Sequence, residues 1–331
     1  MLRFFCSAMF ICVAVWFFGI AVTGPLRGSA RPVAQPKAAP RMQAVPQPYE
    51  QISFQRDGVE IARFHFGPTL KRPFVFPLIG PSGRSLTRIG HPHDPISHSH
   101  HNSVWIAHND VNGVSFWADT GKNTGRIVHQ RVEKLADGDT EASVTSLNQW
   151  IEDATKKTLM TERRKMTVQL LDKGEWLLIL DLQFDVKEEV TLGKTPFGMI
   201  GVRLAKSIGV NDGNGTIRNS DGKVNEKEIF WKPAKWVDYS GAIVNKTVEG
   251  VTLLDHPANP NHPSAFHVRS DGWMGASLTF DGARKIEPGK SLRLRYGLYV
   301  HAGMPSVEAL DVRWASFAKT EVSDLTPLKK K

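Results

Sequence analysis

Hydrophobic and polar positions alternate with a period of two in several segments of the chain. Every second residue is apolar from Leu292 to Val300, from Leu178 to Val186 and from Met166 to Leu170. Because side chains of a strand point alternately to its two faces, each segment predicts a half-buried β-strand. Asp–Gly pairs and similar turn sequences separate such runs along the chain.

Helical periodicity is rare by comparison. One helix is predicted after Pro305, where Val307, Leu310, Trp314 and Phe317 recur on one face. We expect this helix to pack on the sheets as a brace. Many strands with a single long helix predict an all-β fold, namely a large antiparallel β-sandwich with one C-terminal helix.

The N-terminal residues 1–30 have the pattern of a targeting segment. A basic start at Arg3 precedes an almost wholly apolar run, Phe4 to Val22, which is just long enough to span a bilayer. We therefore expect an exported protein that is periplasmic, secreted or membrane-anchored, with cleavage and anchoring both open. Residues 31–48 hold five prolines and predict an extended linker. The sandwich domain is then expected over residues 49–320, with a basic tail over 321–331.

Charge and cysteine content exclude several classes of function. Of the net charge of +9, five units come from residues 1–47 and three from the terminal lysines, so the domain itself is nearly neutral. A nucleic-acid partner is not expected, because it needs basic residues clustered on the folded domain. Cys6 and Cys12 both lie in the apolar run, which leaves the domain without disulfides, thiolate metal sites or a cysteine nucleophile.

The histidines are concentrated in two clusters. Six of the twelve lie between His91 and His108, and three more lie between His256 and His267. Histidine titrates near neutral pH and is the commonest metal ligand. We expect the two clusters to be loops that meet at one polar cleft and form the site.

In the first cluster, an extended chain would point His98 and His100 to one face and His101 to the other. A histidine pair at this spacing can bind a metal in β-sandwich enzymes, although no third ligand follows at a fixed spacing. We favour a metal-free catalytic or substrate-binding cluster without a cofactor. A metal site and a solvated polar loop are the alternatives.

The residues after the first cluster continue the pattern. His108 ends an apolar strand, Asp110 is placed to orient its ring, and Asn112 followed by Gly113 predicts a type I′ turn. The alternative is a strand-end histidine that is hydrogen-bonded to the turn.

The second cluster lies in a loop that prolines stiffen. His256, Asn259 and His262 stand next to prolines, and His267 begins the following strand. Rigid loops on a sandwich often carry ligand-binding groups, although a purely structural loop is the alternative.

Three further polar residues complete the candidate set. Asp238 and Tyr239 follow Trp236, a mixture that suits a polyol ligand and equally suits a buried Tyr–Asp contact. Arg203 is a charge on an apolar strand and should be paired or face a cleft, because unpaired burial is costly.

An ordered set of short motifs identifies a family resemblance over residues 50–303. The motifs are Pro73–Leu78, His100–His101, Trp105, His108–Gly113, Phe116–Trp117, Thr195–Gly198, Gly201–Arg203, Trp236–Gly241, Asp255–Pro263 and His267–Arg269. They resemble a bacterial and fungal domain family of unknown function that carries the label "methane oxygenase PmoA"-like. The family is similar to galactose-mutarotase-like supersandwiches, which include epimerases, polysaccharide lyases and glycoside hydrolases. The chain departs from the family at Asn102, where Arg is usual, and at Phe266, where Trp is usual.

We therefore predict an exported carbohydrate-active protein that performs acid–base chemistry on a sugar at a histidine-rich cleft, with a carbohydrate or other polyol as ligand. The predicted catalytic residues are His101, His108, His256 and His267. The predicted substrate-binding residues are His98, His100, Asp110, Asn112, Arg203, Asp238, Tyr239, Asn259 and His262. The alternatives are a non-catalytic carbohydrate-binding or envelope protein, and a metal-dependent oxygenase or hydrolase, as the family label implies.

Overall fold

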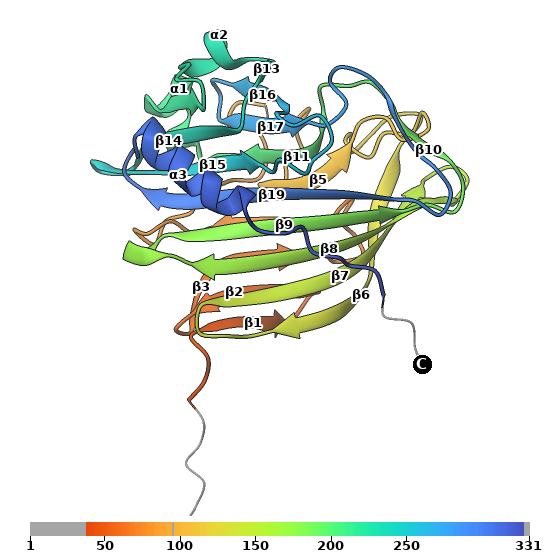
Figure 1. Cartoon of the computed structure of the whole chain (residues 1–331), viewed down its shortest axis with the longest axis horizontal. Helices are drawn as coiled ribbons and strands as arrows, with labels where there is room; N and C mark the ends of the chain where they lie inside the picture. Colours follow the sequence, from red (N-terminus) through yellow and green to blue (C-terminus); the bar gives the residue numbers. More distant parts are fainter. Residues whose placement is uncertain (1–37, 95, 328–331) are drawn as a thin grey trace, which may run out of the picture. The chain divides into compact units, whose positions relative to one another are not determined.

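The computed structural model describes residues 38–94 and 96–327, and these build two large antiparallel β-sheets (Figure 1). The nine-stranded sheet runs in the order β1 (Met42–Gln47), β2 (Gln51–Arg56), β3 (Val59–His65), β4 (Phe74–Leu78), β5 (Val104–His108), β11 (Gly198–Arg203), β17 (Trp273–Ser277), β16 (Ala265–Arg269) and β13 (Lys232–Pro233). The eight-stranded sheet runs in the order β12 (Thr216–Asn219), β14 (Trp236–Val244), β15 (Thr247–Asp255), β19 (Ser291–Ala302), β9 (Trp176–Asp185), β8 (Thr158–Leu170), β7 (Glu141–Glu152) and β6 (Gly125–Ala136).

Smaller elements connect the sheets. A two-stranded ribbon pairs β10 (Val190–Leu192) with β18 (Arg284–Ile286). The short helical elements are the 3-10 turns η1 (Asp172–Gly174) and η2 (Lys206–Ile208) and the helices α1 (Val210–Gly213) and α2 (Asn225–Ile229). The one longer helix in the described residues is α3 (Val307–Ala318), which Ser306 caps by accepting a hydrogen bond from the Ala309 amide. These observations confirm the predicted antiparallel β-sandwich with a C-terminal helix.

The main core lies between the two sheets, where apolar side chains of both inner faces pack together. The three alternating segments form β8, β9 and β19, so the strand predictions are confirmed. The prediction that each is half-buried fails for β9 and for most of β19, because residues on the outer face are also buried, namely Ile179, Asp181 and Gln183 of β9 and Arg295 and Tyr299 of β19. Tertiary packing covers that face, which strand periodicity cannot reveal.

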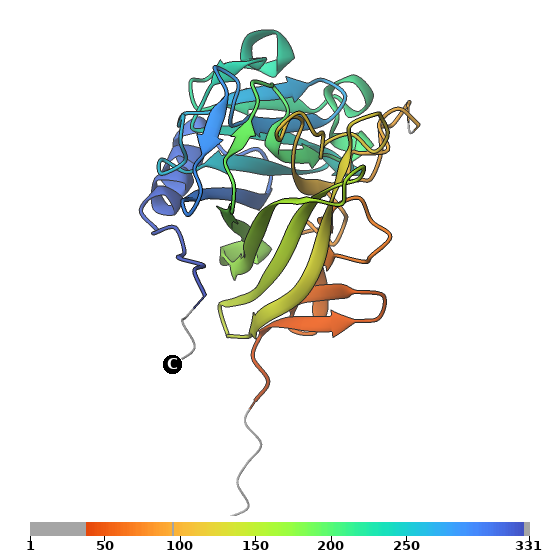
Figure 2. The same cartoon turned by 90° about the vertical axis from the view of Figure 1, so that its right-hand side faces the viewer.

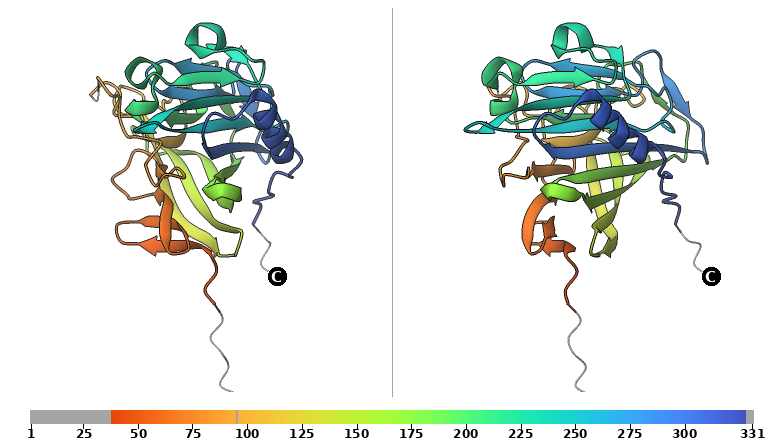
Figure 3. Two further views of the ribbon diagram at one scale, coloured as in Figure 1. Left: turned by 90° about the vertical axis from the view of Figure 1, so that its left-hand side faces the viewer. Right: turned by 60° about the vertical axis from the view of Figure 1, so that its left-hand side comes forward.

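The helix α3 and the segment after it provide this cover (Figure 3). Leu310 and Phe317 of α3 pack on Leu177 and Ile179 of β9 in a second apolar cluster. Further along, the Ser323 hydroxyl donates to Asp181. The Leu325 amide donates to Gln183 of β9, and Gln183 donates to the Thr326 hydroxyl, so the predicted tail joins the folded domain up to residue 326. Its last residues, 328–331, lie outside the described residues.

The predicted linker boundary is wrong by several residues. Residues 42–47 form β1, which pairs with β2 and lies beside β6 and β7 (Figure 2). Met42 and Ala44 are buried, and the Ala44 amide donates to Asp137. An extended, proline-containing segment can serve as an edge strand, because the N–H that a proline lacks is needed only on the paired side. The targeting segment 1–30 and linker residues 31–37 lie outside the described residues.

No helix in residues 38–94 or 96–327 is long and apolar enough to cross a membrane.

Candidate functional site

A cavity of about 550 Å³ opens on the face of the nine-stranded sheet that is turned away from the sandwich core. Arg203, Trp273 and Arg269 lie side by side on that face, because the register pairs Arg203 with Trp273 and Trp273 with Arg269. His267 lies two residues before Arg269 and shares its face. A volume of this size is typical of small-molecule sites.

Loops supply the other residues that line the cavity. His91, His98, His100 and His101 come from the connection between β4 and β5. The remaining lining residues are Asn109 and Trp117 after β5, Phe197 before β11, and Asp271 in the turn between β16 and β17.

An aromatic cluster lies beneath the cavity, and Trp273 of this cluster lines it. Trp105 and Trp273 belong to an aromatic cluster on this face of the sheet and are almost completely buried. The Trp105 ring lies over Gly201, where a Cβ atom would collide with it. Glycine at this position therefore lets the tryptophan lie flat against the sheet.

The first histidine cluster is folded into turns rather than extended. Residues 97–100 form a turn, so that His98, His100 and His101 contact one another, with ring centroids 4.5–5.8 Å apart. His91 joins them, with its ring centroid 4.8 Å from that of His98. The expectation that His101 points away from His98 and His100 is therefore wrong. Pro92 and the turn bend the backbone and bring all four rings to one side.

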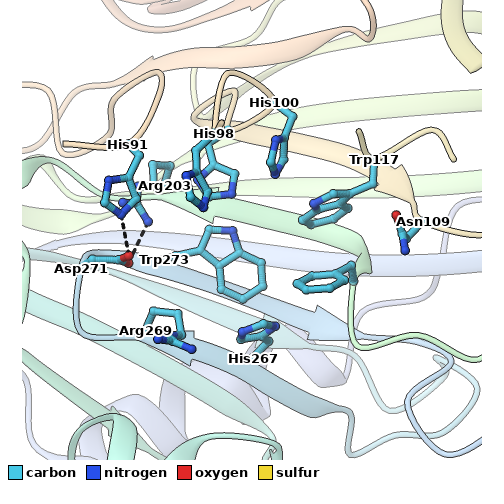
Figure 4. Close-up of a pocket in the computed structure, with 12 residues that line it drawn as sticks. His91, His98, His100, Asn109, Trp117, Arg203, His267, Arg269, Asp271 and Trp273 are labelled. Carbon is cyan, nitrogen blue, oxygen red and sulfur yellow. Dashed lines mark hydrogen bonds and ion pairs between the residues drawn. The ribbon is translucent and has the colours of Figure 1, made fainter. Parts of the chain in front are cut away.

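His101 and His267 face each other across Trp273. The His101 ring stacks on Trp105 at 5.4 Å and lies 6.4 Å from Trp273, and the His267 ring lies 4.3 Å from Trp273. Figure 4 shows His267 on one side of the Trp273 indole and His91, His98 and His100 on the other. Neither imidazole hydrogen-bonds to any residue that the structure describes, and the Nδ1 atom of each is buried. Both rings are therefore free to bind a ligand.

Burial makes these histidines neutral. It lowers the pKa of His100 to about 4, with the nearby Arg72 charge adding to the effect, and it lowers the pKa of His267 to about 4, with Arg269 adding. The pKa of His101 is lowered still further. Burial is the largest cause, and the neighbouring His100 and Arg203 add to it. Neutral imidazoles both donate and accept hydrogen bonds, and each can accept a proton from a ligand.

A fixed ion pair closes one end of the cavity. Arg203 Nη1 lies 2.9 Å from Asp271 Oδ1, and His91 Nε2 lies 2.8 Å from Asp271 Oδ2. His91 Nδ1 accepts hydrogen bonds from the amides of His93 and Asp94, so its Nε2–H is the donor to Asp271. Burial acts to raise the pKa of Asp271, but Arg203 and His91 outweigh it and lower that pKa overall.

Five of the thirteen predicted site residues line the cavity, namely His98, His100, His101, Arg203 and His267. His108 does not. It is fully buried, its Nδ1 accepts from the Asp110 amide, and its Nε2–H donates to Thr279 Oγ1, which donates in turn to the Gly193 carbonyl. This corrects the predicted catalytic placement, because the strand end turns the ring into the protein.

The second histidine cluster does not meet the first, which corrects the predicted convergence. His256 Nε2 lies 2.9 Å from the Thr320 carbonyl, and the His262 ring stacks on Trp314 at 5.8 Å, so both pack on the C-terminal helix and its end. Asn259 bonds to Asp255 and to the backbone of Arg295. Residues 256–264 carry the chain from one sheet to the other, and only His267, on β16, reaches the cavity.

The other predicted binding residues have structural contacts instead. Asp110 and Asn112 accept hydrogen bonds from the amides of Gly113 and Thr191. Positive φ angles of 53° at Asn112 and 83° at Gly113 agree with the predicted type I′ turn.

Asp238 and Tyr239 also lie outside the cavity lining. Asp238 is fully buried among four hydrogen-bond donors of the eight-stranded sheet, and burial raises the pKa of Tyr239. The Tyr239 hydroxyl accepts from the Gly272 amide and donates to the Arg269 carbonyl. It therefore supports the turn that carries Asp271.

Sequence reasoning missed seven lining residues, which are His91, Asn109, Trp117, Phe197, Arg269, Asp271 and Trp273. His91 belongs to the first histidine cluster, so its position in the sequence already marked it as a candidate. Asp271 is visible only as the first residue of an Asp–Gly turn, and Trp273 only as an apolar strand residue. Cross-strand register places them beside Arg203, and a single sequence does not reveal that register.

The buried His108 predicts a pH dependence of stability. Burial lowers its pKa to about 4, against 6.5 for an exposed histidine. Between these values the unfolded chain binds a proton that the folded chain does not, so the free energy of unfolding should fall as pH falls from 6.5 to 4. Urea unfolding at several pH values measures this change. A His108→Gln variant retains a donor for Thr279 without titrating, and its stability should fall less over this range. Equal pH dependence in the two proteins would contradict the assignment.

Metal binding has no preformed site in the described part of the chain, where no group of three or more His, Cys, Asp or Glu side chains is arranged to hold an ion.

Comparison with known proteins identifies a family and distant structural matches. Residues 51–315 match the model of a family of unknown function, DUF6807. The PmoA-like label is not part of that match. A comparison with curated proteins finds no match.

Similar solved structures include the galactose mutarotase related enzyme from Lactobacillus acidophilus (10% identity, 69% of this chain and 94% of that chain covered, TM-score 0.32). A GalM/aldose epimerase homologue from C. elegans is also similar (8% identity, 81% and 100% covered, TM-score 0.33). Heparan sulfate lyase HepC from Pedobacter heparinus matches at 9% identity and a TM-score of 0.38, with 78% of this chain and 36% of that chain covered.

Proposed function

The chain belongs to DUF6807, a family of unknown function, and we propose that its cavity binds a carbohydrate and performs proton transfer on it. The observation that carries this proposal is the pair of neutral imidazoles, His101 and His267, on opposite sides of the Trp273 ring. Both lack hydrogen-bond partners among the described residues, and both line the same cavity.

The lining suits a sugar ring. Phe197, with the small exposed parts of Trp117 and Trp273, offers apolar surface for the C–H face of a pyranose, and the histidines and Asn109 offer donors and acceptors for its hydroxyl groups. Arg269, which is paired with Glu226, adds a guanidinium group whose N–H groups can donate to a ligand hydroxyl or carboxylate. The three linked residues Arg203, Asp271 and His91 provide fixed dipoles at the end of the cavity that they close.

The proposed chemistry uses each imidazole once. One neutral ring accepts a proton from a ligand O–H or C–H group and becomes an imidazolium, and the other neutral ring donates an N–H hydrogen bond to a ligand oxygen and keeps its proton. The imidazolium then returns its proton to the ligand, so that both rings end neutral and the protons balance. Epimerases, lyases and glycosidases all use such a step.

A second candidate function is carbohydrate binding without turnover. One observation favours it: in residues 38–94 and 96–327 no carboxylate hydrogen-bonds to His101 or His267, whereas a catalytic histidine is usually oriented by such a partner.

A screen of the purified full chain against an oligosaccharide library, reading out both binding and product formation, tests the proposal and separates the two candidates. We expect affinity for at least one carbohydrate together with product formation. Affinity without product would support the binding protein instead, and no affinity for any member would contradict both. Metal analysis of the same sample tests the chemistry that the PmoA-like label implies, for which a stoichiometric transition metal would be evidence.

Export is part of the proposal. A basic start followed by the apolar run Phe4 to Val22 has the pattern of a secretory signal or anchor, and the domain after it contains no cysteine. Retention of the full chain in the cytoplasmic fraction of its own cells would contradict it.

A further inference from the structure

Three aromatic side chains, Phe230, Trp231 and Phe280, adjoin the cavity without lining it. We call them the aromatic platform. The Phe230 and Trp231 rings stack at 4.3 Å, and Trp231 lies 5.7 Å from Phe280. Phe230 and Trp231 also contact His267, at 4.9 and 6.1 Å. The platform is therefore continuous with the cavity through His267.

Trp231 is exposed in a way that core packing does not explain. Its side chain is 43% exposed, and it is the one tryptophan in the described part of the chain that is largely open to solvent. By contrast, Trp105, Trp150 and Trp236 are fully buried. Together with Phe230 and Phe280, Trp231 forms a continuous aromatic surface beside the cavity, on which the C–H face of a ring can stack.

The backbone holds Trp231 in this position. Its φ angle is +59°, an uncommon conformation for a bulky residue, which costs about 1–3 kcal/mol. The Trp231 amide donates to the Phe266 carbonyl at 2.8 Å, and the next residues form β13 on the edge of the nine-stranded sheet. A backbone hydrogen bond thus attaches Trp231 to β16, the strand that carries His267.

A charged pair borders the platform. The Arg269 guanidinium lies over the Phe230 ring at 5.6 Å, and its Nε lies 3.0 Å from Glu226. Arg269 also lines the cavity, so that it is the second residue shared between the two surfaces. The pair presents groups that can bind sugar hydroxyls beside an apolar surface on which a ring can stack.

We infer that the aromatic platform is a second carbohydrate subsite, and that the ligand has at least two linked rings, one in the cavity and the next on Trp231. This inference rests on the proposed carbohydrate function and extends it to a substrate class of oligosaccharides or polysaccharide ends. The occupant is the neighbouring ring of the same ligand, because His267 and Arg269 belong to both surfaces.

Calorimetry with matched ligand pairs tests the inference. The probes are methyl β-glucoside with cellobiose, methyl β-galactoside with β-1,4-galactobiose, and galacturonic acid with digalacturonic acid. For at least one pair, the full-length wild-type protein should bind the disaccharide at least tenfold more tightly than the single ring. Trp231→Ala should remove this preference and leave the affinity for the single ring within twofold, and Trp231→Phe should restore most of it.

The control variant is Val312→Ala, which removes an exposed apolar side chain of α3, a helix that contributes nothing to the cavity lining or the platform. It should retain the full disaccharide preference. Thermal melts of all variants confirm folding, and Trp231→Phe preserves the aromatic packing if the alanine variant unfolds.

Two results would overturn the inference and leave the cavity proposal intact. One is binding of single rings by the wild-type protein with no gain for the disaccharide. The other is an equal loss for both ligands, or for neither, in Trp231→Ala. A wild-type protein that binds none of these probes and no member of the oligosaccharide library would overturn the proposed function together with the inference.

Discussion

Alanine at His101, and alanine at His267, should each lower turnover of the sugar identified by the oligosaccharide screen at least tenfold. Each substitution removes one of the two neutral imidazoles that face each other across Trp273, and with it either the proton acceptor or the hydrogen-bond donor to the ligand. General acid–base groups typically contribute a factor of about 10²–10⁴. The loss should fall mainly on kcat, because the aromatic surfaces that hold the ring remain.

His256→Ala is the matched control for this experiment. His256 is also a histidine of the second cluster and was an equal candidate by sequence, but its ring packs against Phe317 at the end of α3. Its removal should leave turnover within about twofold, allowing a small loss of stability. Unchanged activity in both the His101 and the His267 variant would end the catalytic assignment, and a loss in the control alone would move the site to the second cluster.

The pH profile adds a readout that a packing defect would not change. Because burial lowers the pKa of His267 to about 4, its neutral form persists through neutral pH. Activity that needs the neutral imidazole should therefore stay level from pH 8 toward pH 5 and fall only on approach to 4. A fall centred near the ordinary histidine value would show that the ligand site is not desolvated as the structure has it.

Asp238→Ala should lower the free energy of unfolding by about 3–5 kcal/mol, the typical cost of removing one partner of a buried charged pair. Asp238 Oδ2 lies 2.7 Å from Arg218 Nη2, and its Oδ1 lies 2.9 Å from His301 Nε2. Thr252 and Ser240 donate to it as well. Burial acts to raise the pKa of Asp238, yet His301 and Arg218 hold it at about 2, so the buried group is a carboxylate.

Urea unfolding measures this loss, and Asp238→Asn provides the comparison. The amide keeps an acceptor for one donor but loses the charge, so its stability should lie between those of the wild-type and alanine proteins. At a temperature where the variants are folded, sugar affinity should not change. Normal stability with lost affinity would restore the predicted role of Asp238 in binding the substrate.

The sequence predicted the secondary structure better than the site. Period-two alternation located β8, β9 and β19 because each strand buries one face on the core. The repeat of Val307, Leu310, Trp314 and Phe317 located α3 for the corresponding reason at helical spacing. Histidine clustering located the loop that covers the cavity. Each of these signals depends on residues that are close together in the sequence, so a single sequence is enough to reveal it.

The residues that complete the cavity come from pairing between distant strands. Arg203, Trp273 and Arg269 become neighbours only through the register of β11, β17 and β16, and a shift of one residue would turn all three side chains into the core. The same geometry explains the failure of the predicted convergence. His256 and His262 lie in the connection between the sheets, whereas His267 lies on a strand of the site.

The sequence alone determined that this protein contains a β-sandwich domain without cysteines, with a C-terminal helix and a histidine-rich loop, because alternation, helical spacing and composition are properties of neighbouring residues. Only the tertiary structure decided which histidines share a cavity, that Asp271 and Trp273 belong with them, and that His108 and Asp238 are structural. Those assignments depend on which strands lie side by side and which face each presents, and this arrangement is set by packing over the whole chain.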